Sequence, residues 1–388
     1  ENGLTIFLYV DGCYGTYSTN RLDKKELETL ITNGIESTRY LAVDESRMLA
    51  DPARYYKGGK PDLQLFDKKL YEVNPDDKVA IARAAAEEVL GKDERIISVD
   101  SSYSDGEGSS YRLISNGFEG ESKSTWFSVS ASVSIKGEGE ARPQDYWYDS
   151  ALFYDKLTKT GIGAKALERV LRKLGQKKAK SGKYTMVVDP MNVGNLLSPM
   201  LSALYGSALR QKNSFLMDKL DTKVASDLFT LRDEPHAIGA NGSRYFDNEG
   251  VATEPRTVFD KGVLKTYFID TYNGKKMDIA PTISTPSRLI LTPGDKDLNG
   301  LVADIKQGIL VTGFNGGNSN SSTGDFSYGI EGFLIEDGKL TQPVNEMNVT
   351  GNMVTLWNSL VAVGNDPQPN RSWQIPSLVF EGVDFSGL

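Results

Sequence analysis

The sequence predicts an α+β protein of two domains. The N-terminal domain should hold an antiparallel sheet with helices, and the C-terminal domain should be strand-rich, with a barrel-like or mixed sheet. The first observation is length, because 388 residues exceed the roughly 100–200 of a single domain. The second is a change to period-two alternation between residues 95 and 155. The third is a short basic stretch at 175–183, interpreted as a linker, so the predicted domains are 1–181 and 182–388.

The N-terminal elements begin with a strand over residues 4–10, which are mostly apolar and aromatic. Because the chain does not begin with Met, we expect N-terminal sequence to be missing from it. Asp23 is a suitable N-cap for a helix over 24–40, where leucine and isoleucine recur at helical spacing. Residues 44–64 predict a loop, and a second helix over about 74–91 has Pro near its start and Gly at its end.

The region from 95 to 155 predicts an antiparallel meander. Between residues 125 and 135, apolar side chains alternate with serines, which is the pattern of a half-buried strand. Glycine, serine and asparagine recur about every ten residues around it and indicate turns. A helix over 161–174 follows, with its alanine, valine and leucine residues on one side.

The C-terminal half starts with an apolar strand at 184–188 and continues into an apolar helix at 194–210. Mostly short strands and turns follow, with two further helices near 297–307 and 350–360. Residues 313–324 are mostly glycine, asparagine and serine, which predicts a flexible loop.

Charge and residue counts exclude several classes of function. Lys and Arg number 44 against 52 Asp and Glu, and the formal charge of −8 argues against a nucleic-acid binder or a polybasic membrane-surface protein. No apolar run reaches the ~20 residues of a membrane span. Cys13 is the only cysteine and His236 the only histidine. These counts exclude an internal disulfide, multi-cysteine zinc sites and every site that needs two histidines.

The remaining catalytic and metal motifs are weak. A Ser-His-Asp or Cys-His site would have to use His236, and the chain has no Gly-x-Ser-x-Gly elbow. We interpret His236 as a hydrogen-bonded structural residue at the start of a strand, and Cys13 as a small buried thiol. Residues 295–300 begin like a calcium loop, but Lys306 stands where the bidentate Glu is needed. We therefore predict that Asp297 caps a helix.

A series of short motifs, many with glycine at turn positions, runs in order through the second half of the chain. It comprises Lys212–Leu220, Glu234–Ala240, Phe246–Thr253, Gly262–Tyr272, Gly324–Phe333, Pro343–Glu346, Gly351-Asn352, Val363–Asp366 and Pro376–Leu378. Tyr14–Asn20 and the helix before the linker match more loosely. With these motifs essentially the whole chain resembles the TldD/PmbA family, sometimes labelled modulators of DNA gyrase, and in particular its PmbA/TldE type.

The resemblance implies a pair of related subunits that digest unfolded peptides and mature peptide antibiotics of the microcin type. The TldD-type subunit is a zinc metalloprotease with His-Glu-x-x-x-His on a helix, whereas the PmbA/TldE type shares the fold without the metal site. Here the matching positions are Ser198, Pro199 and Ala203, and no cysteine lies between Asp366 and Pro376. These residues replace neither the imidazole ligands nor the glutamate base, so no catalytic residue, metal or cofactor is expected.

We therefore expect a non-catalytic subunit that pairs with a TldD-type metalloprotease in the cytoplasm and offers sheet edges and loops to an unfolded peptide. A dimer is expected, homodimeric when the partner is absent, to which Trp357 and Trp373 could contribute. Two alternatives stay open. One is a self-associating peptide-binding or scaffold protein without a protease partner. The other is a gyrase-linked regulator, which the negative charge disfavours; neither nucleic acid nor membrane is an expected partner.

Overall fold

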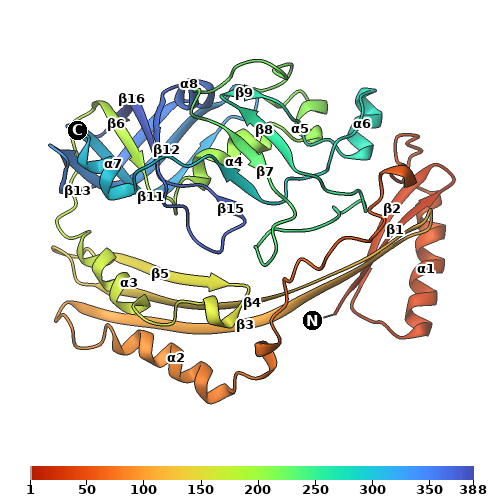
Figure 1. Cartoon of the computed structure of the whole chain (residues 1–388), viewed down its shortest axis with the longest axis horizontal. Coiled ribbons are helices and arrows are strands. Elements are labelled where there is room, and N and C mark those ends of the chain that lie inside the picture. Colours follow the sequence, from red (N-terminus) through yellow and green to blue (C-terminus); the bar gives the residue numbers. More distant parts are fainter. Residues whose placement is uncertain (1) are drawn as a thin grey trace.

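The computed structural model describes residues 2–388 and confirms the α+β class. Figure 1 shows the C-terminal half above a long, curved three-stranded sheet, with an N-terminal hairpin and helix at one end of that sheet. The central sheet is antiparallel, as predicted for the N-terminal domain, and in the described chain only β6–β11 and β10–β15 pair in parallel among the strands. No helix within residues 2–388 has the length and apolar character needed to cross a membrane.

The N-terminal unit is a hairpin covered by one helix. Strands β1 (Leu4–Val10) and β2 (Cys13–Thr19) pair antiparallel, and α1 (Lys24–Arg39) packs on them. The carboxylate of Asp23 accepts a hydrogen bond from the Glu26 backbone N–H at 3.1 Å, which confirms the predicted cap. Two short 3₁₀ helices, η1 (Pro52–Arg54) and η2 (Lys68–Tyr71), interrupt the long connection that follows.

The central sheet has the predicted antiparallel order β3–β4–β5 but much longer strands than predicted. Its strands are β3 (Ile96–Ile114), β4 (Phe118–Ile135) and β5 (Gln144–Ala151). The glycines and serines expected to mark turns lie within extended backbone, and β3 turns into β4 only around Gly117, where φ is +110°. Helices α2 (Pro75–Glu87) and α3 (Ile162–Leu171) cover its apolar face, and η3 (Tyr154–Lys156) follows β5.

The C-terminal half contains a closed, barrel-like mixed sheet in the order β13-β12-β11-β6-β16-β14. A further pairing between β13 and β16 closes the ring, which confirms the barrel-like prediction. The bounds are β6 (Gly182–Val188), β11 (Gln307–Ser319), β12 (Asp325–Glu336), β13 (Lys339–Asn352), β14 (Leu360–Val363) and β16 (Leu378–Ser386). Closure satisfies backbone groups that an open edge would leave exposed.

A second sheet in this half has the order β15-β10-β7-β8-β9, so β15 lies at its edge. Helices α4, α7 and α8 pack against these sheets, and α5 and α6 contact each other. The strand bounds are β7 (Leu231–Asp233), β8 (Arg256–Asp260), β9 (Val263–Leu264), β10 (Leu289–Leu291) and β15 (Trp373–Gln374). The helix bounds are α4 (Gly194–Ser202), α5 (Gly206–Arg210), α6 (Thr271–Met277), α7 (Leu298–Ala303) and α8 (Met353–Asn358).

The prediction of a single helix over 194–210 was wrong. The helix is broken between α4 and α5, where Tyr205 has extended backbone with ψ 140°. There the Gly206 N–H donates to the Phe268 carbonyl at 2.8 Å, and the Phe268 N–H donates to the Leu204 carbonyl at 2.9 Å. Pairing with a distant segment therefore replaces the helical hydrogen bonds at this point, which a local pattern does not reveal.

Three further predictions in this half need correction. The helix predicted near 297–307 ends at Ala303, because the chain then enters β11, where Gly308 pairs with Thr185 of β6. The helix near 350–360 begins only at Met353, after β13 ends. Residues 313–319 continue β11 rather than forming a loop, with two register shifts against β12. Gly317, with φ +92°, permits the second shift, since a Cβ there would lie 2.1 Å from the Ser327 carbonyl oxygen.

Buried ions join the central sheet to the barrel. Lys173, just after α3, contacts Glu331 of β12 at 2.7 Å and Asp145 of β5 at 3.2 Å. Arg169 of α3 reaches the same Asp145 carboxylate at 3.2 Å. All these side chains are at least four-fifths buried. The network therefore fixes how β5 and its following segment face the C-terminal half.

Candidate functional site

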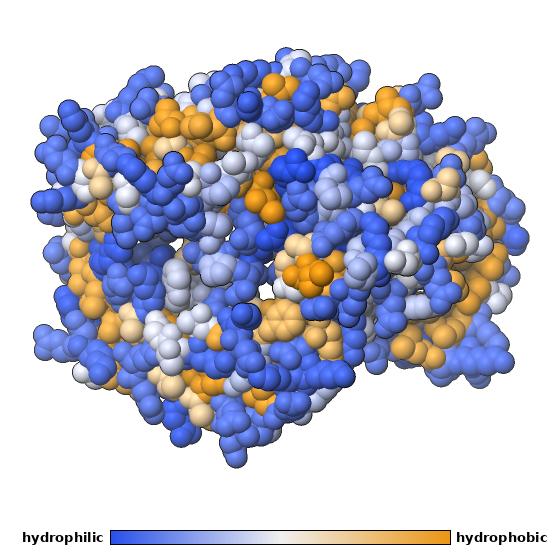
Figure 2. Space-filling view, in the orientation of Figure 1, coloured by the Kyte–Doolittle hydropathy of each residue, from blue (hydrophilic) through white to orange (hydrophobic). Residues whose placement is uncertain are grey.

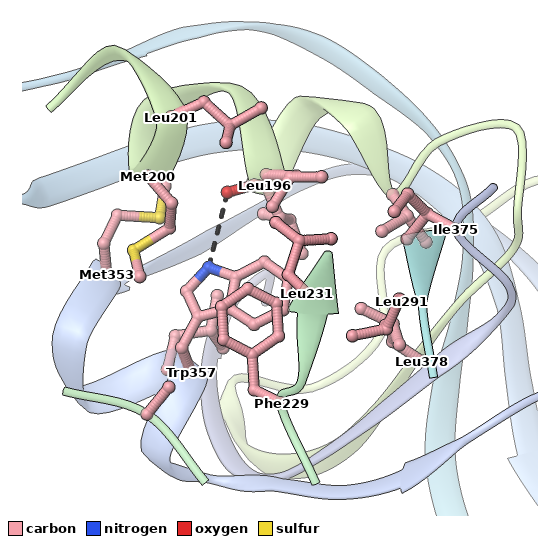
Figure 3. Packing of buried hydrophobic residues seen from close by; sticks show 14 of the residues in the cluster. Leu196, Met200, Leu201, Phe229, Leu231, Leu291, Met353, Trp357, Ile375 and Leu378 are labelled. Carbon is pink, nitrogen blue, oxygen red and sulfur yellow. Dashed lines mark hydrogen bonds between the residues drawn. The ribbon is translucent and has the colours of Figure 1, made fainter. Parts of the chain in front are cut away.

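Helix α4 is the element on which the resemblance locates a zinc motif, and its apolar side is fully buried. Leu196 and Met200 lie in the largest core cluster, while Ser198 on the other side of the helix is exposed. Trp357 of α8 packs beneath the helix, and its indole N–H donates to the Leu196 carbonyl at 3.4 Å (Figure 3). Because α4 is amphipathic, this packing accounts for its position without any ligand.

The three motif positions do not fit a zinc ion. Ser198 offers only a neutral hydroxyl, and Pro199 lies inside the helix without a proton acceptor in its side chain. Ala203 is 1% exposed within the core cluster and directly follows the last residue of α4. Zinc sites in proteins use Cys, His, Asp or Glu, and across residues 2–388 no three such side chains are close enough to hold a metal ion.

Asp189, at the end of β6, is the nearest acidic residue before α4 in the chain, and its carboxylate serves the local structure. One oxygen accepts from the Asn192 backbone N–H at 3.0 Å and from the Asn192 side-chain amide at 2.7 Å. The same amide also donates to the Thr312 carbonyl at 2.8 Å, which ties the segment to β11. Burial raises the pKa of Asp189, and the Asn192 hydrogen bonds only partly offset that effect.

The segment between Asp366 and Pro376 is held by a second set of hydrogen bonds. The Asp366 carboxylate accepts from the Ser377 hydroxyl at 2.7 Å and from the Leu298 N–H at 2.9 Å. The Gln374 side-chain amide donates to the Arg371 carbonyl at 2.7 Å. These contacts give a defined loop with no cysteine, at the place where the resemblance expects a further metal ligand in the TldD type.

The two residues considered as catalytic groups have separate partners. His236 Nε2 lies 3.1 Å from the Thr253 hydroxyl, its ring packs on Tyr245, and burial is the first cause that lowers its pKa. It lies in a turn and not at the start of a strand as predicted. The Cys13 thiol is buried in the N-terminal hairpin and donates to the Leu41 carbonyl at 3.1 Å. The structure does not bring the two side chains together as hydrogen-bond partners.

The segment that begins like a calcium loop is a helix cap. The Asp297 carboxylate accepts from the Gly300 backbone N–H at 2.9 Å and starts α7, as predicted. Lys296 pairs with Asp304, one residue beyond the C-terminal end of that helix. The acidic residues of this segment therefore have local structural roles.

A cleft of about 500 Å³ lies between the segment after β5 and the C-terminal half. Figure 2 shows the molecular surface hollowed between these two parts. Its lining includes three cations but no Asp or Glu, and we call it the cationic cleft. The lining residues that matter here are Phe153, Lys156, Ile238, Arg288, Arg371 and Gln374.

The cations of the cationic cleft come from three separate parts of the chain. Lys156 ends η3 after β5, Arg288 precedes β10, and Arg371 precedes β15. Among residues 2–388 none of the three forms an ion pair. Burial is the first cause that lowers the pKa of both Arg288 and Arg371, although a guanidinium still stays charged at neutral pH. Sequence reasoning missed this cluster because no local motif links the three positions.

Two known family domains match most of the chain. Residues 68–174 match the PmbA/TldA metallopeptidase central domain, and residues 181–387 match the PmbA/TldA metallopeptidase C-terminal domain. The protein thus has the architecture of a metallopeptidase-like α+β protein. The chain belongs to the PmbA/TldD family.

Three similar proteins illustrate the family. The metalloprotease PmbA homolog of Haemophilus influenzae is 28% identical over 398 residues, covering 100% of this chain and 86% of that protein. A crystal structure from Bacteroides thetaiotaomicron, described as a modulator of DNA gyrase, is 73% identical with a TM-score of 0.98, covering 100% and 88%. TldE from Thermococcus kodakarensis has a TM-score of 0.80 at 22% identity, covering 97% and 88%, and shares the fold.

Proposed function

We propose that this chain is the non-catalytic, PmbA/TldE-type member of a metalloprotease pair and acts with a separate TldD-type zinc subunit on unfolded peptides. One observation carries the proposal: Ser198, Pro199 and Ala203 occupy the motif positions on α4 and offer no zinc ligand or general base. Relatives named as metalloproteases support a role in proteolysis. The side chains at the three motif positions support a non-catalytic role for this chain. Within this proposal the domain boundary lies near residue 181, between the two family matches.

The proposal includes a dimer with the TldD-type subunit, and a homodimer when that subunit is absent. Trp357 cannot contribute to the interface as expected from the sequence, because it is 0% exposed and belongs to the core. Trp373 is half-buried at the edge strand β15 and stays a candidate contact. A stable interface of this kind buries more than ~2,000 Å² in total.

The test compares the chain alone, a TldD-type subunit alone, and the two co-purified, with an unfolded peptide as substrate. We expect no cleavage by the chain alone and chelator-sensitive cleavage by the pair. The control is a TldD-type subunit whose motif histidines are replaced by alanine, which should abolish cleavage by the pair. Cleavage by the isolated chain, or one zinc per chain that survives dialysis, would contradict the proposal.

The scaffold alternative stays open and gains one specific observation, the cationic cleft, which needs no protease partner to bind a ligand. Isolation of the chain from its own cells as a homo-oligomer, with no protease subunit bound, would favour it. A gyrase-linked regulator finds support in the descriptions of similar structures, such as the Bacteroides protein, and in no feature of the site. The formal charge of −8 and the position of the cations inside a cleft count against direct DNA contact.

A further inference from the structure

We propose that the cationic cleft binds an extended peptide segment through carboxylate groups of that peptide. This inference goes beyond the proposed function, since the binding requires this chain alone and no zinc subunit. Lys156, Arg288 and Arg371 line one cleft of about 500 Å³ with no acidic residue among the lining side chains. The chain has a net charge of −8, but all charged residues that line this cleft are cations. Such a cleft favours an anionic ligand.

Two acidic residues beside the cationic cleft are paired with other cations. Asp155, adjacent to Lys156, contacts Lys69 of η2. Glu234, whose charge acts on Arg288, is bound by Arg232 at 2.7 Å. Lys69 and Arg232 therefore partly offset the negative potential of these carboxylates at the cleft.

The backbone of Arg288 and the side chain of Arg371 are held in place before any ligand binds. The Arg288 backbone N–H donates to Asp233 at 2.8 Å, and the Arg288 carbonyl accepts from the Glu234 N–H at 2.8 Å. Arg371 lies over the Tyr148 ring at 4.6 Å, and its carbonyl accepts from Gln374. Fixed positions of this kind reduce the entropy that a ligand must overcome on binding.

Arg288, which lines the cationic cleft, has one donor that no group among residues 2–388 satisfies. The Arg288 Nε is buried, and no group among residues 2–388 accepts its hydrogen. A buried N–H of a charged group without an acceptor is costly, so the protein itself leaves the Arg288 guanidinium incompletely satisfied. A guanidinium can donate two parallel N–H bonds to a carboxylate, so the arginines of the cleft favour a carboxylate over a neutral amide.

Two sheet edges and an apolar wall indicate a peptide rather than a free anion. Strand β5, whose outer edge is unpaired in its sheet, leads directly into Phe153 and Lys156, and β15 forms the edge of the second sheet. Edge strands offer backbone groups that pair with an extended chain of any sequence. Ile238, 61% exposed, and Phe153 provide apolar contacts for side chains of the same peptide.

The test measures fluorescence anisotropy of labelled eight-residue Gly/Ser peptides against the purified chain. One peptide carries three central Glu residues, its matched form carries three Gln residues, and each is made with a free or an amidated C-terminus. We expect the Glu peptide to bind at least about tenfold more tightly than the Gln peptide. Sensitivity to C-terminal amidation would assign the recognised carboxylate to the chain end instead of the side chains. Equal affinity of all four peptides would overturn the proposal.

The variants Arg371→Gln and Lys156→Gln should each weaken the preferred peptide by about tenfold. Lys156 is exposed on η3, so its variant tests the cleft even if a change at Arg371 affects folding. The matched control is Lys92→Gln, an exposed lysine just beyond α2 that does not line the cleft. Unchanged binding in both cleft variants, or an equal loss in the control, would contradict the inference. No metal or protease enters this assay, so its result is independent of the proposed function.

Discussion

Helix α4 and the cationic cleft differ in how their polar groups are used. Around α4 the polar groups have internal partners: Asp189 binds Asn192, and the Trp357 N–H binds the helix backbone. In the cleft, the cations have no acidic partner, and one buried donor has no acceptor. The helix on which the resemblance locates a metal site is thus built for packing here. The cationic cleft, which no sequence motif marks, contains cations without an ion pair. It is therefore a better candidate for a ligand site than α4.

The largest expected effect is on the packing side of this comparison. Trp357→Ala should lower the free energy of unfolding by about 3–5 kcal/mol, because it removes a fully buried ring that contacts Phe229 and Phe380. The measurement is the urea midpoint and slope. Trp357→Phe, which keeps a ring but loses the hydrogen bond to Leu196, should cost clearly less. Equal losses for the two variants would show that the hydrogen bond, and not the packing, holds α4.

A smaller effect is expected where imidazole is reintroduced at the motif positions. Ala203→His should destabilise the protein by about 1–3 kcal/mol, because the site is 1% exposed and a ring there overpacks the core. Ser198→His, at an exposed position of the same helix, should stay within about 0.5 kcal/mol of the original stability. Thermal unfolding of both variants would check this. If Ala203→His left the stability unchanged, the interpretation that position 203 is closely packed in the core would be wrong.

Local patterns predicted the elements whose hydrogen bonds are local. The cap of α1 by Asp23 and the cap of α7 by Asp297 were both predicted, because a side chain and a helix start lie three residues apart. The break at Tyr205 and the strand over 313–319 were not predicted. Both depend on backbone pairing with other segments of the chain. The local composition instead favours a helix at Tyr205 and a loop over 313–319.

The two candidate sites also differ in whether local sequence could predict them. The absence of zinc ligands on α4 could be inferred from the sequence, because it concerns residue types within one short motif. The cationic cleft could not, since Lys156, Arg288 and Arg371 are brought together only by the fold. Each of these cations is surrounded by unremarkable neighbours in the chain. A single sequence therefore carries no signal that would have singled them out.

The pH dependence of stability sharpens the comparison at the start of α4. Burial raises the pKa of Asp189 above the ordinary value of 3.8, so the native state holds this proton more tightly than the unfolded state. The stabilisation is complete below pH 3.8 and is lost as the pH rises through the native pKa. Compared with Asp189→Asn, the original chain should lose stability over that window, by up to about 1.4 kcal/mol per pH unit. Urea unfolding across this range tests it; a difference that is flat or grows in favour of Asp189 would contradict the argument.

The smallest effect is expected for the stability of the cleft variants. Arg371→Gln removes a guanidinium stacked on Tyr148, an interaction worth about 0.5–1 kcal/mol, while the Arg371 carbonyl keeps its bond from Gln374. Lys156→Gln removes an exposed ammonium without an ion pair in the described chain and should change stability by less than about 0.5 kcal/mol. Urea unfolding of the two variants, run beside Trp357→Ala, provides the contrast. A loss of about 2 kcal/mol or more in either cleft variant would mean that these cations stabilise the fold as the groups around α4 do. In that case the cleft cations would have a structural role, and their presence would no longer indicate a ligand.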